Sequence, residues 1–178
     1  LAVPENNSLG PETAGIAWDG FLLGYSSGTD ELYPFLKEHI GDFHWTPAEA
    51  FALGMAPAGS DTPGCGAVAA ATPEHLTVVS WALCQTEAAK AANRRETRFP
   101  SELWARSRIY GQRCNRRLHR ALAEALTEQG HQAVAPGLLP EMTDQESPAY
   151  GWASNWSERH VAYISGLGTF SLCGGLIT

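Results

Sequence analysis

Residues 76–83 read Leu76-Thr77-Val78-Val79-Ser80-Trp81-Ala82-Leu83, and they are the most strand-like stretch of this 178-residue chain. The stretch is apolar almost throughout and rich in β-branched residues, which is typical of a central strand covered on both faces. Residues 131–135 are predicted to form a second, short strand that Pro136 stops. The apolar run at residues 21–25 fits either a strand or a docking segment.

Helical segments are predicted on both sides of that strand, each with its own start signal. They are a helix capped by Asp30 that runs to about Ile40, one opened by the capping box Thr46-Pro47-Ala48-Glu49 that runs to about Gly54, one from Ser101 to near Gly130, and one from Asn155 to Gly166. Residues 56–66 and 136–151 are predicted loops, and the residues before Ser101 are a predicted linker. This alternation indicates an α/β or α+β layered domain, with a mixed sheet flanked by helices, over residues 1–178.

The helix predicted to start at Ser101 carries one stripe of apolar and small residues. Its members are Trp104, Ser107, Gly111, Cys114, Leu118, Leu122 and Ala125. Small residues at the middle of a stripe let another element pack closely against the helix, so we expect a tight contact there.

Charge is distributed unevenly, although the net charge is only −7. Residues 90–120 carry +8, between segments of −10 and −5, and they hold Lys90, Arg94, Arg95, Arg98, Arg106, Arg108, Arg113, Arg116, Arg117 and Arg120. Such a block is typical of a site for phosphate or nucleic acid. The alternative, which we favour at this stage, is a solvated helix face whose arginines pair with the acidic segments, because surface ion pairs are common and individually weak.

Several classes of protein lack support in the sequence. No apolar run is long enough for a transmembrane helix, and the chain does not begin with a secretory signal pattern. The cysteines at positions 65, 84, 114 and 173 form no Cys-x-x-Cys pair, so we expect no metal site within residues 1–178. We favour reduced thiols in a cytoplasmic protein over a secreted disulfide framework, which the even number of cysteines also allows. Rossmann, P-loop, Gly-x-Ser-x-Gly and His-Glu-x-x-His motifs are also missing.

The last part of the chain is dense in glycine, at Gly166, Gly168, Gly174 and Gly175. Glycine lowers stability wherever neither a positive φ nor close backbone approach is needed, so the tract is predicted to lie against a partner. A domain seldom ends on a strand-like Gly-Leu-Ile-Thr, so we expect a piece of a longer protein.

Three neighbouring ionisable residues precede these glycines. Glu158 is explained by helix capping and the helix dipole, whereas Arg159 opposes that dipole and suggests a carboxylate or phosphate partner. His160 is either a packed residue or a ligand or proton donor. The nearby aromatic residues belong either to the core or to a surface that stacks on a flat cofactor or base; they are Tyr150, Trp152, Trp156 and Tyr163.

Three stretches resemble a known superfamily, that of corrinoid-dependent epoxyqueuosine reductases and reductive dehalogenases. They are Thr77-Val78-Val79-Ser80-Trp81, Asn93-Arg94-Arg95-Glu96-Thr97-Arg98-Phe99-Pro100-Ser101-Glu102, and residues 154–168 with their continuation to Thr178. The chain is most similar to an uncharacterised 4Fe-4S ferredoxin-type branch, over nearly its whole length. The likeness to the superfamily at large covers only about residues 154–178.

The resemblance implies a nitroreductase-like fold that holds cobalamin, with 4Fe-4S clusters in a ferredoxin-like region beyond residue 178. In such enzymes the clusters deliver electrons to cobalt, and the protein supplies binding, orientation and electrostatics. Trp152 stands where epoxyqueuosine reductases keep an aspartate that protonates substrate, and Asp144 lies eight residues too early. The substrate is therefore left open between a small molecule and a nucleoside.

The resulting expectation is the N-terminal, corrinoid-binding part of an iron–sulfur reductase, active as an oxidoreductase only in the full-length protein. The expected cofactor-binding residues are Arg159, Gly166, Gly168, Gly174 and Gly175. The expected proton donors are Tyr163 and His160. The expected anion-binding residues are Arg94, Arg95 and Arg98. Two alternatives stay open. One is a non-catalytic module that binds RNA, such as tRNA, or another anion through residues 90–120; the other is a flavin-dependent enzyme of the nitroreductase type. The sequence predicts no membrane partner and leaves the oligomeric state open.

Overall fold

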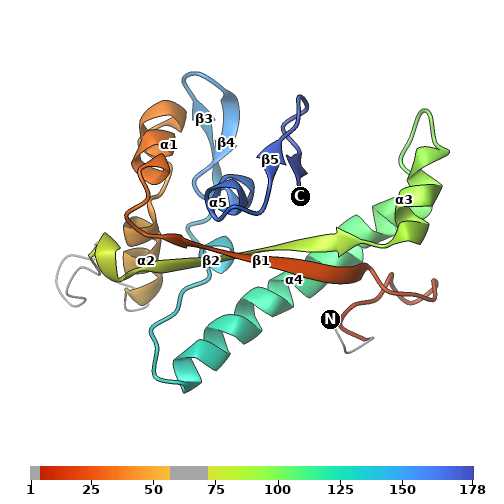
Figure 1. Cartoon of the computed structure of the whole chain (residues 1–178), viewed down its shortest axis with the longest axis horizontal. Coiled ribbons are helices and arrows are strands. Elements are labelled where there is room, and N and C mark those ends of the chain that lie inside the picture. The colour runs from red at the N-terminus through yellow and green to blue at the C-terminus, as the bar shows by residue number, and fades with distance from the viewer. Residues whose placement is uncertain (1–4, 57–71) are drawn as a thin grey trace. The chain divides into compact units, whose positions relative to one another are not determined.

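The computed structural model describes residues 5–56 and 72–178, and within them the chain has a mixed α+β architecture (Figure 1). Its helices are α1 (Leu32–Ile40), α2 (Pro47–Met55), α3 (Glu87–Arg94), α4 (Glu102–Glu128) and α5 (Glu158–Ile164), with short 3-10 turns at Pro73–His75 and Pro136–Leu138. The strands pair as three two-stranded antiparallel sheets, β1 (Trp18–Ser27) with β2 (Thr77–Gln85), β3 (Asp144–Ser147) with β4 (Gly151–Ser154), and β5 (Thr169–Phe170) with β6 (Leu176–Ile177).

The chain folds into two compact units, and each is built from two separate stretches of sequence. Unit 1 comprises residues 1–22 and 81–122, and unit 2 comprises residues 23–80 and 123–178. The described residues contain no larger mixed sheet. Among the described residues β2 pairs only with β1, and most of its side chains are half-buried, so the expectation of a central strand covered on both faces is wrong. An apolar sequence is compatible with partial burial of this kind, because the composition of a strand does not show how many other elements pack against it.

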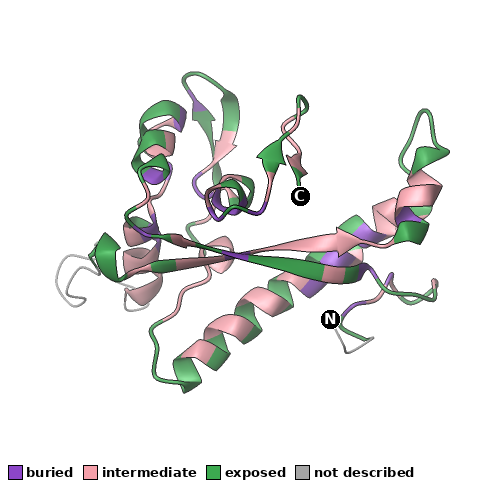
Figure 2. Ribbon diagram, in the orientation of Figure 1, coloured by how far each residue is buried: buried purple, intermediate pink, exposed green. Residues whose placement is uncertain are grey.

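The core of unit 1 forms where Trp18 meets the small-residue stripe of α4. Trp18 is buried with Leu9, Ala17 and Cys114. A Cβ added at Gly111 would lie 2.5 Å from the Trp18 indole, and the indole Nε1 donates a hydrogen bond to the Gly111 carbonyl over 3.2 Å. The buried residues of α4 lie on one side of its first half (Figure 2). The predicted close contact is thereby confirmed, and glycine is required at its centre.

A buried asparagine fixes the backbone of Trp18 in the same core. Asn7 is only 1% exposed. Its Nδ2 donates to the Trp18 carbonyl over 2.8 Å, and its Oδ1 accepts from the Trp18 amide over 2.9 Å. The N-terminal loop is thus attached to the start of β1 by side-chain hydrogen bonds that mimic a strand partner.

The core of unit 2 contains Tyr33, Ala50, Trp156 and Val161, with Val78 of β2 packed against it. The capping box before α2 is present as predicted: the Thr46 hydroxyl accepts from the Glu49 amide, and the Glu49 carboxylate accepts from the Thr46 amide over 2.8 Å. α1 also begins and ends close to its predicted bounds. The predicted start signal of α2 is therefore confirmed, whereas the predicted cap of α1 is wrong: Glu31, not Asp30, is its N-cap, and it forms no side-chain capping hydrogen bond.

Four local predictions are wrong. Residues 131–135 form no strand, while the predicted loop 136–151 contains β3 and leads into β4, whose register pairs Glu146 with Trp152. The predicted linker before Ser101 contains α3. Ser157, not Asn155, caps α5, because the Asn155 side chain bonds the Thr143 amide and the Glu141 carbonyl instead. Each of these predictions failed because the local sequence signal was weak or because the side chain bonds a partner that is distant in sequence.

The loop predicted at residues 56–66 lies outside the described residues from position 57 onward. None of the helices in the described ranges combines the length and apolar character needed to cross a bilayer.

Candidate functional site

The predicted proton donors lie on α5 of unit 2, next to the β5–β6 hairpin (Figure 1). The His160 ring lies 5.1 Å from the Phe170 ring, and the Tyr163 ring lies 5.4 Å from the same ring, measured between centroids. His160 is half-buried, whereas Tyr163 is 42% exposed. Residues three apart on a helix share a face, which explains why one phenylalanine contacts both. We refer to these three residues as the α5 aromatic cluster.

A second histidine, which the sequence did not single out, joins this cluster from the loop before α2. His44 is buried, and its Nδ1 donates to the Ser154 carbonyl over 2.9 Å. This bond leaves Nε2 as the unprotonated nitrogen of the neutral ring. The ring lies edge-on to His160, with 6.5 Å between centroids. No motif links positions 44 and 160, so only the fold reveals the pair.

Both histidines favour the neutral state. Burial lowers the pKa of His44, and the Lys37 ammonium lowers it further, against the Ser154 hydrogen bond and the Glu49 charge, which raise it. Burial also lowers the pKa of His160, with further lowering by His44 and by the Arg159 guanidinium. Two imidazoles in the protein are therefore held uncharged at neutral pH, where each can accept a proton.

These pKa shifts predict a loss of stability in mild acid. Because the folded pKa of each histidine lies below the unfolded value of about 6.5, the unfolded chain binds more protons as the pH falls through 6.5 toward the folded pKa. The free energy of unfolding should therefore decrease over that window. Urea denaturation at several pH values between 7.5 and 5.5 measures it.

The matched variants separate this effect from general acid sensitivity. We expect His44→Gln to flatten the dependence on pH in that window, whereas His131→Gln, at an exposed position, should leave it unchanged. Burial raises the pKa of Glu49, but its hydrogen bonds to Thr46 and Lys37 together lower the pKa by more. Glu49 therefore stops stabilising the fold only at a pH below this window, and it does not affect the measurement. An equally steep dependence in His44→Gln would contradict the interpretation.

The four glycines of the C-terminal tract have different environments. Gly166 (φ +73°) ends α5 and has no neighbouring atom within 4 Å of an added Cβ. An added Cβ at Gly168 would overlap the Ile177 carbonyl of the hairpin. Gly174 (φ +71°) needs glycine for its backbone, and Gly175 leaves ordinary space for a Cβ. The chain's own backbone thus explains Gly166, Gly168 and Gly174, and among the four glycines Gly166 alone combines a positive φ with open space.

Arg159 connects α5 to the hairpin turn. Its guanidinium donates to the Gly174 carbonyl over 2.6 Å. This bond uses one of its five donors, and the residue is otherwise exposed. Arg159, His160, Tyr163 and Gly174 thus lie together on α5 and the adjoining hairpin.

The predicted anion-binding arginines belong to unit 1, whereas the α5 aromatic cluster belongs to unit 2. Arg94 ends α3, Arg95 follows it, and Arg98 lies over the ring of Phe99 at 5.2 Å. All three are exposed. They hold no carboxylate partner among the residues that the structure describes.

The expected neutralisation of the basic segment by acidic residues is wrong for most of its members. In the described part of the chain, only Lys90 and Arg106 of this segment form ion pairs, Lys90 with Glu87 and Arg106 with Glu12 and Glu102. Unit 1 contains ten of the twelve bases but six of the nineteen acids and carries +4, while unit 2 carries −11 with two bases and thirteen acids. The eight unpaired arginines outnumber the acids of their own unit.

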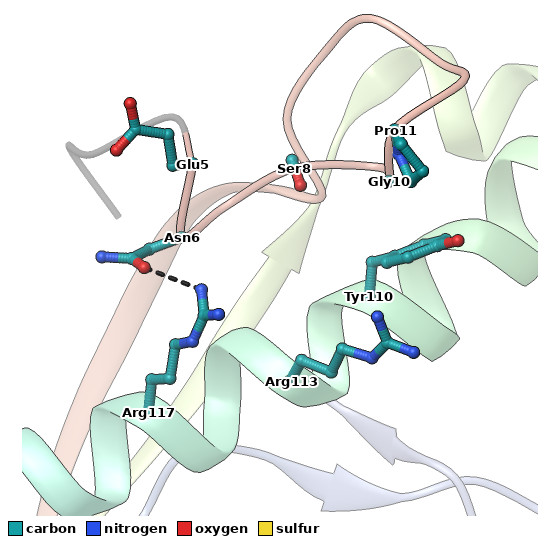
Figure 3. Close-up of a pocket in the computed structure, with 8 residues that line it drawn as sticks. All are labelled: Glu5, Asn6, Ser8, Gly10, Pro11, Tyr110, Arg113 and Arg117. Atoms are coloured by element: carbon teal, nitrogen blue, oxygen red, sulfur yellow. Dashed lines mark hydrogen bonds between the residues drawn. The ribbon is translucent and has the colours of Figure 1, made fainter.

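Unit 1 also contains a pocket of about 250 Å³ between the N-terminal loop and α4. Tyr110, Arg113 and Arg117 supply its α4 wall, and Asn6, Ser8 and Gly10 supply its loop wall (Figure 3). The sequence-based assignment missed it, although a tyrosine and two arginines at helical spacing were a readable signal.

In the described ranges, no group of three His, Cys, Asp or Glu side chains is placed to hold a metal ion. The thiols described, Cys84, Cys114 and Cys173, are all free. No protein-family model matches the chain, and neither a curated protein nor a solved structure is significantly similar to it.

Proposed function

We propose that this chain is the corrinoid-binding part of a cytoplasmic, iron–sulfur-cluster-dependent reductase. The observation that carries the proposal is an apolar surface beside two proton-carrying side chains in unit 2. Tyr163, Phe170, Leu172 and Ile177 expose large apolar area on α5 and the adjoining hairpin, next to His160. Large apolar area open to water is typical of a surface that covers a ligand. The resemblance of residues 154–178 to corrinoid enzymes supports the same assignment.

The residues present fit a large flat ring in two respects. Gly166 leaves open space beside its backbone, which allows a ligand to approach closely. Tyr163 and Phe170 offer ring faces for stacking. Arg159, whose remaining donors are exposed, would bind a carboxylate, amide or phosphate group at the rim. When bound, the corrinoid supplies low-valent cobalt as the reductant, with electrons from the 4Fe-4S clusters.

The chain's own contribution to the reaction is a proton. His160 is held neutral by burial and by His44, so it can accept a proton from solvent and pass it on. Tyr163 lies on the same face of α5 and is 42% exposed, and its hydroxyl donates to a bound substrate. The nitroreductase-like layering that the resemblance implies is part of the proposal.

Cobalamin titration of the full-length, cluster-bearing protein tests this proposal. We expect saturable binding with a shift of the visible bands. Tyr163→Phe should retain binding but lose roughly 10²-fold or more in the reduction rate, the usual contribution of a proton donor, while Tyr150→Phe on the exposed β3–β4 turn should change neither. Absence of both the band shift and saturable binding would exclude the proposal. A yellow, flavin-containing preparation would favour the nitroreductase alternative.

A second candidate function is binding of RNA or another anion by unit 1. The eight unpaired arginines of the basic segment favour it. Binding to RNA through phosphates should weaken steeply with salt.

A further inference from the structure

The pocket of unit 1 has a wall that its own packing holds in place. Gly10 adopts φ +97° and lies against the Tyr110 ring, since an added Cβ would be 2.3 Å from that ring. Leu9 and Asn7, on the same loop, are buried in the core. The loop is therefore anchored on both sides of Ser8, whose side chain lines the pocket. A pre-formed wall lowers the entropy that ligand binding must overcome.

The other wall presents two positive charges that form no ion pair with any acid in the described part of the chain. Arg113 and Arg117 are four residues apart on α4, which places them about 6 Å from each other at Cβ. Arg117 donates to the neutral Asn6 Oδ1 over 2.7 Å, and the Arg113 guanidinium lies 4.9 Å from the centre of the Tyr110 ring. Glu5 also lines the pocket, but its carboxylate points away from both arginines in Figure 3, and it forms no ion pair with the described residues.

Arg106 of the same helix provides the contrast. Its guanidinium contacts Glu102 over 2.8 Å and Glu12 over 3.5 Å. The N-terminal segment thus pairs Arg106 with the carboxylate of Glu12, but it pairs Arg117 with the neutral side-chain amide of Asn6. Like charges one helical turn apart repel each other, so an anion between Arg113 and Arg117 would relieve that repulsion.

We propose that this pocket binds a phosphate group, with Arg113 and Arg117 as its charged ligands. Two guanidinium forks present several N–H donors to one group, and a phosphate has enough oxygens to accept from both. The Ser8 hydroxyl adds a further donor. This pocket belongs to unit 1 and gives the second candidate function a specific location.

Isothermal titration of the full chain with inorganic pyrophosphate tests the proposal. The pocket variant is Arg113→Gln/Arg117→Gln, and the matched control is Arg116→Gln/Arg120→Gln, which removes the same charge from exposed positions of α4 outside the pocket. We expect the pocket variant to weaken pyrophosphate binding by about 100-fold, the effect of losing at least one charge-assisted hydrogen bond. The control should change it less than threefold.

Two further titrations distinguish the sources of the phosphate. A nucleoside diphosphate that binds more tightly than pyrophosphate indicates a small phosphorylated ligand. Tighter binding of a single-stranded RNA oligonucleotide than of pyrophosphate indicates that the pocket binds a nucleic-acid backbone. In that case the slope of log K against log salt concentration should become shallower by roughly one to two in the pocket variant. Both results support the pocket.

Chemical modification provides a readout that needs no variant. Phenylglyoxal should label Arg113 and Arg117 more slowly when pyrophosphate is present, while Arg116 and Arg120 react at an unchanged rate. The proposal is overturned if all four arginines are protected equally, if both double variants lose affinity to the same extent, or if neither pyrophosphate, the nucleotide nor RNA binds.

Discussion

Replacement of Gly111 by valine should destabilise the protein by about 3 kcal/mol, near the upper end of the usual range for overpacking a core. The first added carbon already lies 2.5 Å from the Trp18 indole. Trp18 cannot retreat easily, because its ring is hydrogen-bonded to the Gly111 carbonyl and its backbone to Asn7. Valine has a better intrinsic helix propensity than glycine, so any loss is steric. Thermal unfolding followed by circular dichroism should show a decrease in Tm of roughly 6–12 °C.

Ala121→Val is the matched control for this substitution. Ala121 is an exposed residue of the same helix, roughly three turns further along. There, valine should lower the free energy of unfolding by only about 0.5 kcal/mol, through helix propensity alone. Equal effects at the two positions would show that the contact between Trp18 and α4 is not close.

Asn7→Ala should lower the free energy of unfolding by about 3 kcal/mol, because it leaves two buried backbone groups without partners. The Trp18 amide and carbonyl each form a hydrogen bond with the Asn7 side chain, at 2.9 and 2.8 Å. Trp18 itself is 8% exposed, so water cannot replace those bonds without opening the core. Urea denaturation monitored by tryptophan fluorescence would measure the change.

The neighbouring asparagine supplies the control. Asn6 is exposed, and its side chain contacts Arg117 at the surface of the pocket. Asn6→Ala should therefore change stability by no more than about 0.5 kcal/mol, as for most surface substitutions. If Asn7→Ala is equally mild, the N-terminal loop does not hold the start of β1 in solution.

Local sequence signals predicted the elements whose stabilising contacts are close in the chain. The capping box at Thr46 and the stripe around Gly111 depend on spacing that can be read directly, and both were found. The β3–β4 hairpin was missed because its strands are polar and exposed, without the alternation that marks a half-buried strand. Asn155 was assigned to the wrong role because its partners lie 12 and 14 residues away.

The candidate site was predictable to a similar degree. His160 and Tyr163 were chosen from one helix, and the structure places their rings against the same phenylalanine. His44 was not chosen, since more than a hundred residues separate it from Ser154, whose carbonyl orients its ring. The arginines were expected to be neutralised, but net charge per segment does not tell which acids share a unit with which bases. Pairing of charges depends on tertiary structure, which spacing along the chain does not encode.

The division of each unit into two stretches of sequence has a practical consequence for protein production. Residues 1–22 cannot complete their core until residues 81–122 have been synthesised, so unit 1 folds only after much of unit 2 has left the ribosome. No truncation at a single point yields either unit whole. A version of unit 1 for separate expression would need residues 22 and 81 joined by a short linker, and this shorter loop should also lower the entropy cost of closing the core.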